Sequence, residues 1–558
     1  MISQILNKKT QTIHFAALIL AVSSFFSLIL GLIRNNLLST SFAREQTDIF
    51  FVAFRIPDLV YGILITGGIT AAFLPVFSSY FSKNKKQAFK LSSNVLCCFF
   101  IGLSGLSLIL FIFAPFFIKY LVPGFTQAQQ AITLQLMRIM FLSPILLGIS
   151  AILSAILQYH NLFFAYALAP LFYNLGIILG ILVFYPFFGM QGLAWGVVLG
   201  ALLHLAVQIF PVRKTGFHLR LVCDLKFPGL RKIFKLAAPR AIGSGAYHIS
   251  LIVITAIAST ISSGAISIFY YSNYIYGVPI SLIGISFATA VFPALSKNFI
   301  EKKRMEFLEN FNTTFRHLSF FAIPSSFLFF VLRAQIVRLV YGASILQSNY
   351  FDWWATRLTS ASVGILSFSL LTACLVPFLA RVFFAFHDTK TPVKIAVGSM
   401  ALNIASAYFF VWLLGFDNFF QRFLAVILKI SFLENQGVIG LALSITLTSL
   451  FQAFLLLYFL KKKVSEIAGR SLLKIIFQFS SAAFLMAFCA WGSLRFYDFY
   501  FSTQSVVGIA LQGLLAGTVG LIIYLAAVSI LFPREIKNIR RLIAGMLKSK
   551  KPLPLREE

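Results

Sequence analysis

Long apolar runs, separated by short polar segments, fill almost the whole chain. A helix of about 20 apolar residues crosses the hydrocarbon core of a bilayer, whereas membrane β-strands alternate in polarity over about ten residues. Because the runs are long and continuous, we predict an all-α polytopic membrane protein with about 14 transmembrane helices. Their approximate cores are 15–38, 48–81, 91–118, 131–157, 163–185, 190–212, 238–261, 265–296, 315–340, 359–386, 393–415, 436–460, 472–494 and 505–532.

Basic residues collect in every second loop between the predicted helices. Lys83–Lys90, Lys302–Arg304 and Lys461–Lys463 lie on one side, and scattered cations such as Lys119 and Arg422 lie on the other. Lys and Arg in short loops mark the cytoplasmic side of a membrane protein. Both termini are therefore predicted to be cytoplasmic, which requires an even number of helices.

The composition agrees with a membrane protein and limits its chemistry. Hydrophobic residues make up 59% of the chain, the mean hydropathy is +0.90 and the net charge is +30. Because the cations form short loop clusters and not one basic domain, we expect no nucleic-acid partner. The five cysteines lack metal-ligand spacing, and the chain contains no glycine-rich phosphate loop. We therefore expect no cofactor, no metal site and no enzymatic activity.

Two segments have the amphipathic pattern of helices that lie on a membrane surface. Residues 534–550 place Ile536, Ile539 and Leu542 on one helical face with Lys and Arg opposite, and residues 228–237 are a shorter version. Helices of this kind bind anionic leaflets. We expect anionic membrane lipids as partners, with anchoring as the main role of both segments.

The chain also repeats itself. Pro75 aligns with Pro293 at the ends of helices two and eight, and Asn174 aligns with Asn403 further on. Each half then holds six helices, related by an axis along the membrane normal, as in alternating-access transporters. We predict a six-helix bundle at 1–213, a linker with an interfacial helix at 214–237, a second bundle at 238–463, two extra helices at 464–532 and a basic amphipathic tail at 533–558.

The second predicted helix carries charges at bilayer depth. Asp48, Arg55 and Asp58 stand in an apolar segment that also contains two prolines and the pair Gly67-Gly68. A buried charge costs about 2.5–3.5 kcal/mol on insertion scales, and a broken helix needs protein or water around its freed backbone groups. The segment is therefore expected to line a transport path.

Two arginines are the main candidates for binding an anion. Arg34, next to Asn35 in helix one, and Arg55 in helix two can both face a central cavity, where arginine forks suit a diphosphate. The competing interpretation for Arg55 is an ion pair with Asp58 three residues on. For Asp48 the alternative is an N-cap of helix two.

Three histidines, His204, His248 and His317, stand isolated on apolar faces. We expect them to be hydrogen-bonded or to lie at helix interfaces and not to act as ligands.

Several motifs resemble the MurJ (MviN) lipid II flippase family of the multidrug/oligosaccharidyl-lipid/polysaccharide (MOP) exporter superfamily. They are TDIFFVAFRIPD, AFLPVFSSYF, AVFPALSKNF and, most specifically, ARVFFAFHDTKTPVKIAV. The resemblance covers essentially the whole chain. It implies two six-helix bundles around a cationic cavity for the head of lipid II, a groove for its tail at the last two helices, and location in the bacterial inner membrane. It makes Arg34 the cavity arginine of helix one, Asp48 the acid of helix two and Arg55 the basic residue before the proline.

The chain departs from the family pattern at several cavity positions. The family usually has an arginine at Leu28, an acid at Asn35, and charged residues at Tyr61, Thr66-Gly67 and Asn273-Tyr274. Cations and their acidic partners are lost together, which avoids an uncompensated buried charge. The predicted substrate-binding residues are Arg34, Asn35, Asp48, Arg55, Tyr61, Asn273 and Tyr274.

The resulting expectation is a flippase for lipid II, with cell-wall synthesis enzymes as further partners. The thinned set of cations keeps two alternatives open, a flippase for another polyprenyl-linked oligosaccharide and a drug exporter of the same superfamily. A third alternative is a non-transporting scaffold for cell-wall enzymes.

Overall fold

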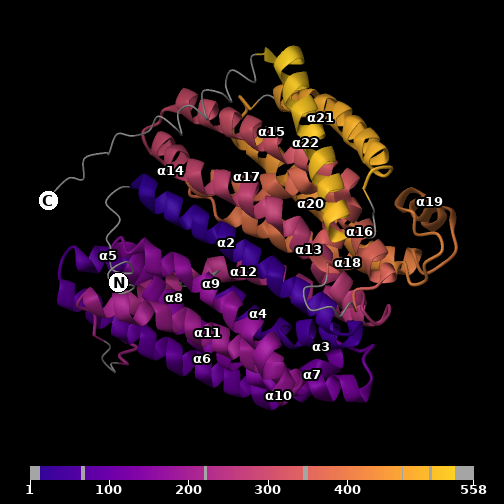
Figure 1. The fold of residues 1–558 in the computed structure, drawn as a ribbon. Helices are drawn as coiled ribbons and strands as arrows, with labels where there is room; N and C mark the ends of the chain where they lie inside the picture. Colours follow the sequence, from indigo (N-terminus) through magenta and orange to yellow (C-terminus); the bar gives the residue numbers. More distant parts are fainter. Residues whose placement is uncertain are drawn as a thin grey trace. The chain divides into compact units, whose positions relative to one another are not determined.

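The computed structural model describes residues 13–64, 70–218, 223–343, 350–467, 469–501 and 505–533. Within these ranges the regular secondary structure is helical and contains no strand (Figure 1). Eleven helices there are long and apolar enough to cross a membrane, or thirteen when each of two bent pairs counts as one span. The remaining predicted span, 48–81, consists of short helices on both sides of residues 65–69, which lie outside the described ranges. This agrees with the predicted all-α membrane fold.

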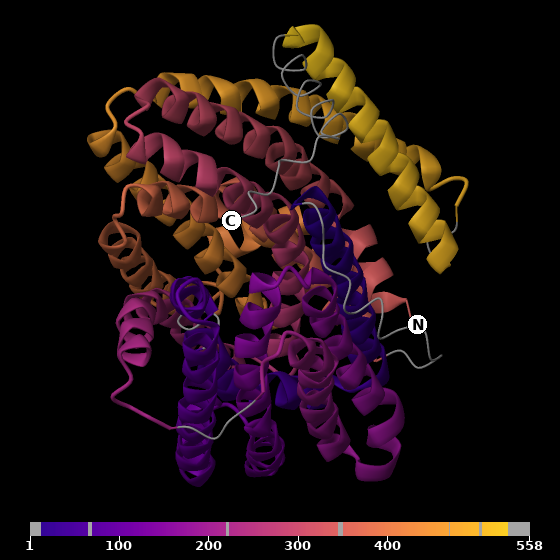
Figure 2. The same cartoon turned by 90° about the vertical axis from the view of Figure 1, so that its left-hand side faces the viewer.

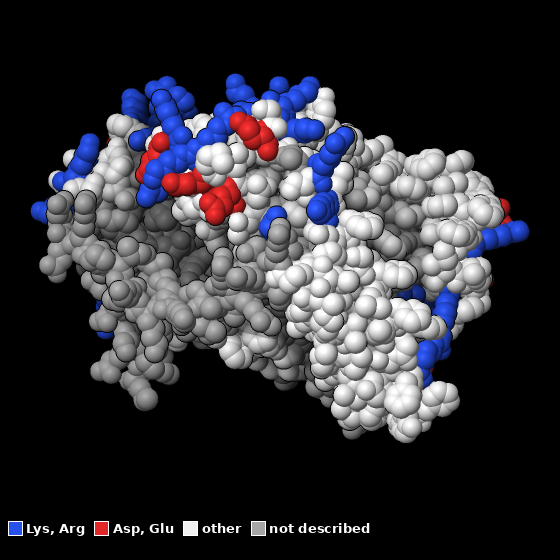
Figure 3. Space-filling view, turned by 90° about the horizontal axis from the view of Figure 1, so that it is seen from above, with Lys and Arg blue, Asp and Glu red and all other residues white. Residues whose placement is uncertain are grey.

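The chain divides into two compact units, with the division between Ile266 and Ser267. The seventh predicted span therefore belongs to the first unit, and the predicted bundle boundaries stay a prediction. The predicted amphipathic tail at 533–558 lies almost wholly outside the described residues. Viewed from one side, Lys and Arg gather along part of the surface, whereas most of the remaining described surface is uncharged (Figure 3).

The first unit is built from helices of very different length. The helices are α2 (Ile13–Ser41), α3 (Arg44–Ala53), α4 (Arg55–Val60), α5 (Thr70–Phe81), α6 (Lys85–Leu121), α7 (Gln127–Met140), α8 (Leu142–Tyr159), α9 (Phe163–Leu179), α10 (Tyr185–Phe188), α11 (Met190–Lys214) and α12 (Pro228–Ser259).

The core of the first unit lies around α5. The rings of Phe73 and Phe77 are fully buried and stack with centroids 5.4 Å apart, and Tyr159 of α8 meets Phe77 edge-on at 5.1 Å. Aromatic pairs in these geometries stabilise by about 0.5–1.5 kcal/mol beyond their buried area. They hold α5, the last helix of span two, in the core of the first unit.

Glycines let α9 and α11 approach closely. A Cβ at Gly176 would lie 2.3 Å from the Cα of Gly200, and one at Gly180 would lie 2.5 Å from the Cα of Gly196. Only small residues permit backbones to meet at this distance inside a membrane, where helix packing relies on van der Waals contact. The glycine spacing of four in both helices sets this contact.

The second unit contains the remaining helices. They are α13 (Ala265–Pro279), α14 (Ser286–Ile300), α15 (Arg304–Val337), α16 (Trp353–Ser367), α17 (Leu370–Ala385), α18 (Lys390–Leu413), α19 (Phe419–Leu428), α20 (Gly437–Lys463), α21 (Gly469–Tyr497) and α22 (Val506–Leu531). The last two run side by side in both views (Figures 1 and 2). They pack on α15, where the hydroxyl of Tyr524 donates to the carbonyl of Phe320 at 3.0 Å.

Spans two and eight, which the sequence aligned with each other, both contain a π-helical turn. In span two the turn covers 61–64, before α5 with Pro75, and in span eight it covers Ile280–Ile285, before α14 with Pro293. Wider turns of this kind break the regular hydrogen-bond ladder and occur often at functional sites. The two turns precede the two prolines that the sequence aligned, and the repeat itself stays a prediction.

Two local features refine the sequence prediction. The segment 228–237, expected as a surface helix, forms the first part of α12, and the helix bends by 52° between Pro228–Ala238 and Gly243–Ser259. The short helix α19 was not predicted. The side chain of Asn418 caps it by accepting the N–H of Gln421 at 2.8 Å.

Candidate functional site

Arg34 lies on α2 and is oriented by two neutral amides. Its Nη1 donates to Oδ1 of Asn174 at 3.1 Å, and its Nε and Nη2 donate to Oδ1 of Asn35 at 3.2 and 3.1 Å. Amide oxygens accept from a guanidinium and fix its direction, and they carry no charge of their own. The structure thus brings together the predicted residues Arg34 and Asn35.

Asn174 of α9 is a contact of Arg34 that sequence reasoning did not select as a candidate. Its amide nitrogen donates to the carbonyl and hydroxyl of Ser27, at 3.2 and 3.3 Å, and to the carbonyl of Pro170 at 3.2 Å. These bonds set which amide atom faces Arg34. The internal repeat could have identified Asn174 as a candidate, because it aligned this residue with Asn403, another buried asparagine.

Asp48 fastens α3 to the loop after α12. Its side chain is 2% exposed, and Oδ2 accepts the backbone N–H of Gly264 at 2.7 Å. Gly264 has φ +88°, a left-handed conformation that favours glycine. The N-cap alternative is wrong, because α3 begins at Arg44 and its N-cap is Ala43. Asp48 lies a full turn inside the helix, where its carboxylate binds a backbone group of another element.

Arg55 is the first residue of α4, directly after the irregular turn at Phe54, and its side chain is 8% exposed. The alternative that Asp58 neutralises Arg55 receives no support, because the carboxylate of Asp58 has a different neighbour. Its Oδ2 lies 3.6 Å from Nδ1 of His248 on α12. The predicted interface role of His248 is confirmed, and its partner is an acid.

His248 lies against the π-helical turn at 61–64. A Cβ on Gly62 would lie 1.9 Å from Nε2 of His248, and the hydroxyl of Ser244, one turn earlier on α12, donates to the carbonyl of Gly62 at 2.9 Å. The bare α-carbon of Gly62 is therefore what allows α12 to approach this turn. Tyr61, half-buried beside it, packs against the core of the first unit.

The remaining predicted residues are distributed elsewhere. Asn273 and Tyr274 lie half-buried on α13 in the second unit, where the rings of Tyr270 and Tyr274 stack with centroids 6.3 Å apart. Thr66 and Gly67 lie outside the described residues. A cavity shared by the two predicted bundles stays a prediction.

The other isolated histidine of the first unit is hydrogen-bonded, as expected. Nδ1 of His204 lies 2.7 Å from the hydroxyl of Ser150, which also accepts the amide of Gln208 at 2.9 Å. Within the described ranges, no three His, Cys, Asp or Glu side chains gather as metal ligands would.

Comparison with known proteins gives a coherent set of relatives. The family model described as "Lipid II flippase MurJ" matches residues 37–512. The chain is 29% identical over 389 residues to the probable lipid II flippase MurJ of Buchnera aphidicola subsp. Acyrthosiphon pisum, covering 69% of this chain and 75% of that protein. It is 28% identical over 417 residues to the lipid II flippase MurJ of Burkholderia cenocepacia, covering 71% and 78%.

Solved structures share the fold. A lipid II flippase MurJ in an inward closed conformation matches with a TM-score of 0.72 at 22% identity, over 93% of this chain and all of that one. An inward-facing multidrug resistance MATE family transporter of the MOP superfamily matches with a TM-score of 0.60 at 12% identity, over 79% and 96%. At these identities the likeness establishes the architecture alone.

Proposed function

This chain belongs to the lipid II flippase MurJ family, and we propose that it translocates lipid II, the undecaprenyl-diphosphate-linked peptidoglycan precursor, from the inner to the outer leaflet. The observation that carries this function is the family match over residues 37–512, which covers most of the chain. The function is transport and involves no covalent reaction. It places the chain in peptidoglycan synthesis, with lipid II as substrate.

Arg34 is the residue that we assign to the diphosphate. Its guanidinium is held by Asn35 and Asn174 through neutral amide oxygens. A guanidinium held in one direction loses less conformational entropy when it binds a phosphate, and arginine forks bind phosphate oxygens in pairs. Asn35 stands where the family usually has an acid. An amide there keeps the acceptor for Arg34 without contributing a negative charge, which offsets the arginine lost at Leu28.

Arg55 is the second anion contact in this proposal. It lies at the break before α4, next to the π-helical turn that contains Tyr61. Tyr61, Asn273 and Tyr274 supply hydroxyl and amide groups for the sugar. Asp48 holds α3 in place by accepting the backbone N–H of Gly264.

The transport cycle follows the predicted architecture. Two bundles, 1–213 and 238–463, alternate access to the two faces of the inner membrane, and the helices at 464–532 receive the polyprenyl tail. Both termini lie in the cytoplasm. Anionic membrane lipids and cell-wall synthesis enzymes are the further partners.

The membrane potential supplies the energy in this proposal. Moving a negative headgroup out of an inside-negative cell is downhill by about 2.3 kcal/mol per charge per 100 mV. Return of an empty cavity with a positive Arg34 is favoured by the same potential. The seventh span, 238–261, contains no acidic residue that could carry a coupling ion.

The second candidate function is a flippase for another polyprenyl-linked oligosaccharide, or a drug exporter of the same superfamily. It is favoured by the neutral residues at Asn35, Asn273 and Tyr274, which stand where the family has charges. Rescue of a strain depleted of its own lipid II flippase distinguishes the two. We expect the wild-type chain to sustain growth and Arg34→Ala to fail at equal membrane expression. Failure of the well-expressed wild-type chain would remove lipid II as the substrate.

A further inference from the structure

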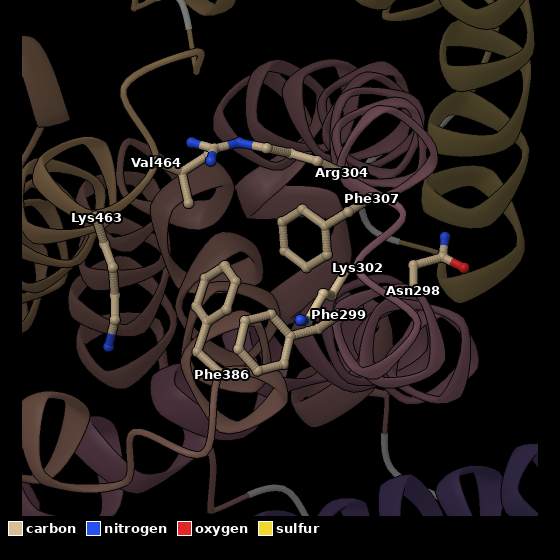
Figure 4. Close-up of a pocket in the computed structure, with 8 residues that line it drawn as sticks. All are labelled: Asn298, Phe299, Lys302, Arg304, Phe307, Phe386, Lys463 and Val464. Carbon is tan, nitrogen blue, oxygen red and sulfur yellow. The ribbon is translucent and has the colours of Figure 1, made fainter.

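A pocket of about 320 Å³ opens in the second unit where four membrane-spanning helices end (Figure 4). Helix α14 ends at Ile300, α15 begins at Arg304, α17 ends at Ala385 and α20 ends at Lys463. The ends of spanning helices lie at the level of lipid headgroups. The basic loops at these ends are also those that the charge pattern assigns to the cytoplasmic side.

The floor of the pocket is aromatic. The rings of Phe299 and Phe386 meet edge-on with centroids 5.0 Å apart, and the ring centroid of Phe307 also lies 5.0 Å from that of Phe386. Figure 4 shows the three rings grouped at the centre of the pocket. Phe299 is 40% exposed, so part of this apolar floor faces outward. Such a surface receives a glycerol backbone or the start of an acyl chain.

The rim of the pocket is cationic. Arg304 and Lys463 lie on one side and Lys302 beside Phe299 (Figure 4). Arg304 is paired with Glu466 at 2.7 Å and Lys463 with Asp388 at 2.8 Å. Lys302 differs from both, because it makes no ion pair with another residue of the described chain.

The backbone directs Lys302 to this position. Lys302 has φ +57° in the tight turn between α14 and α15, and its N–H donates to the carbonyl of Phe299 at 3.2 Å. A left-handed residue other than glycine is uncommon and carries a steric cost. Asn298, 7% exposed, lines the same pocket.

We propose that this pocket binds the phosphate headgroup of an anionic phospholipid of the cytoplasmic leaflet. The phosphate lies against Lys302, with Arg304 and Lys463 around it, and the glycerol and upper acyl chain cover the three phenylalanines. Basic pockets between helices on the cytoplasmic side bind anionic headgroups in this way. A soluble phosphate has no apolar part that could cover the aromatic floor, whereas a phospholipid has one. The lipid is therefore favoured. The pocket belongs to the second unit and Arg34 to the first, and the proposal does not depend on the transported substrate.

The test compares binding of short-chain phosphatidylglycerol, short-chain phosphatidylcholine, glycerol phosphate and inorganic phosphate to the full chain in neutral detergent. The variants are Lys302→Gln, Lys302→Arg and the matched control Lys297→Gln, which removes an equally basic residue of α14 that does not line the pocket. We expect phosphatidylglycerol to bind the wild type most tightly, Lys302→Gln to weaken it about fivefold, and Lys302→Arg and Lys297→Gln to keep it.

Three results would overturn the proposal. Equal weakening by Lys302→Gln and Lys297→Gln would indicate diffuse attraction to a basic surface. Binding of inorganic phosphate or glycerol phosphate as tight as that of phosphatidylglycerol would make the pocket a site for soluble anions. Unchanged binding in Lys302→Gln would exclude the pocket altogether.

Discussion

Nε2 of His248 occupies the position next to the Cα of Gly62 that a side chain would need, since a Cβ there would lie 1.9 Å away. The same ring places Nδ1 3.6 Å from Oδ2 of Asp58. One histidine therefore joins α12 to both α4 and the π-helical turn after it. This contact fixes the geometry of the broken second span, which carries Arg55.

Gly62→Ala should destabilise the protein by about 1–3 kcal/mol, because the added methyl group forces the His248 ring to move. The double variant Gly62→Ala with His248→Ala should recover part of this loss, since the ring is then absent. Thermal unfolding in detergent measures both. Gly102→Ala on α6 is the control, because a Cβ there meets nothing within 4 Å. Equal unfolding temperatures for Gly62→Ala and Gly102→Ala would refute the contact.

Asp48→Ala should cost about 1–3 kcal/mol, because it leaves the buried N–H of Gly264 without this acceptor. Asp48→Asn retains an oxygen in the same place and should cost less. Unfolding temperature and transport are to be measured for both variants. If both variants lose transport equally while unfolding as the wild type does, Asp48 acts through its charge and not as an anchor.

Asn174→Ala should weaken transport at low substrate concentration about tenfold, because losing one hydrogen bond to a charged group costs about 1.5 kcal/mol or more. Asn403→Ala is the matched control, since Asn403 is the repeat partner on α18 and its amide nitrogen donates to the hydroxyl of Thr448 at 3.2 Å. The measurement is the substrate dependence of transport in vesicles. A similar effect of both variants would indicate a packing defect in place of a role through Arg34.

The folding stability of the protein should depend on pH through Asp388. Burial raises the pKa of Asp388, but hydrogen bonds from Lys463 and from the amide and hydroxyl of Thr391 outweigh it and lower the pKa from 3.8 to about 2. A pKa lowered by folding gives stability that is present above pH 3.8 and lost as the pH falls through about 2. Asp388→Asn should therefore unfold earlier than the wild type at pH 7, with the gap closing toward pH 2. A gap independent of pH would contradict the ion pair.

The sequence predicted the spans well because membrane helices are recognised by length and apolarity alone. The irregular turns of span two at Phe54 and 61–64 lie beside the proline and charges from which a broken helix was predicted, whereas Gly67-Gly68 lies outside the described residues. Asp58 shows the limit of local reasoning: its sequence neighbour Arg55 suggested a pair, but its contact is His248, far along the chain.

Other features of the candidate site could not be predicted, because they depend on contacts between residues far apart in the sequence. Asn174 meets Arg34, and Asp48 meets Gly264, only once distant helices pack. The pocket lined by Lys302 combines residues from three loops and three helices, and its cations looked like ordinary loop charges in the sequence. The amphipathic α19 was missed because it is too short for a span.

The most direct test of the account is lipid II translocation by the purified chain in sealed vesicles, measured as the fraction of headgroups that an external probe reaches. We predict that the wild-type chain moves lipid II, that an inside-negative potential speeds export, and that Arg34→Ala abolishes transport while Lys297→Gln does not. Lipid II that stays in place with the wild-type chain would contradict it, as would transport that Arg34→Ala leaves unchanged.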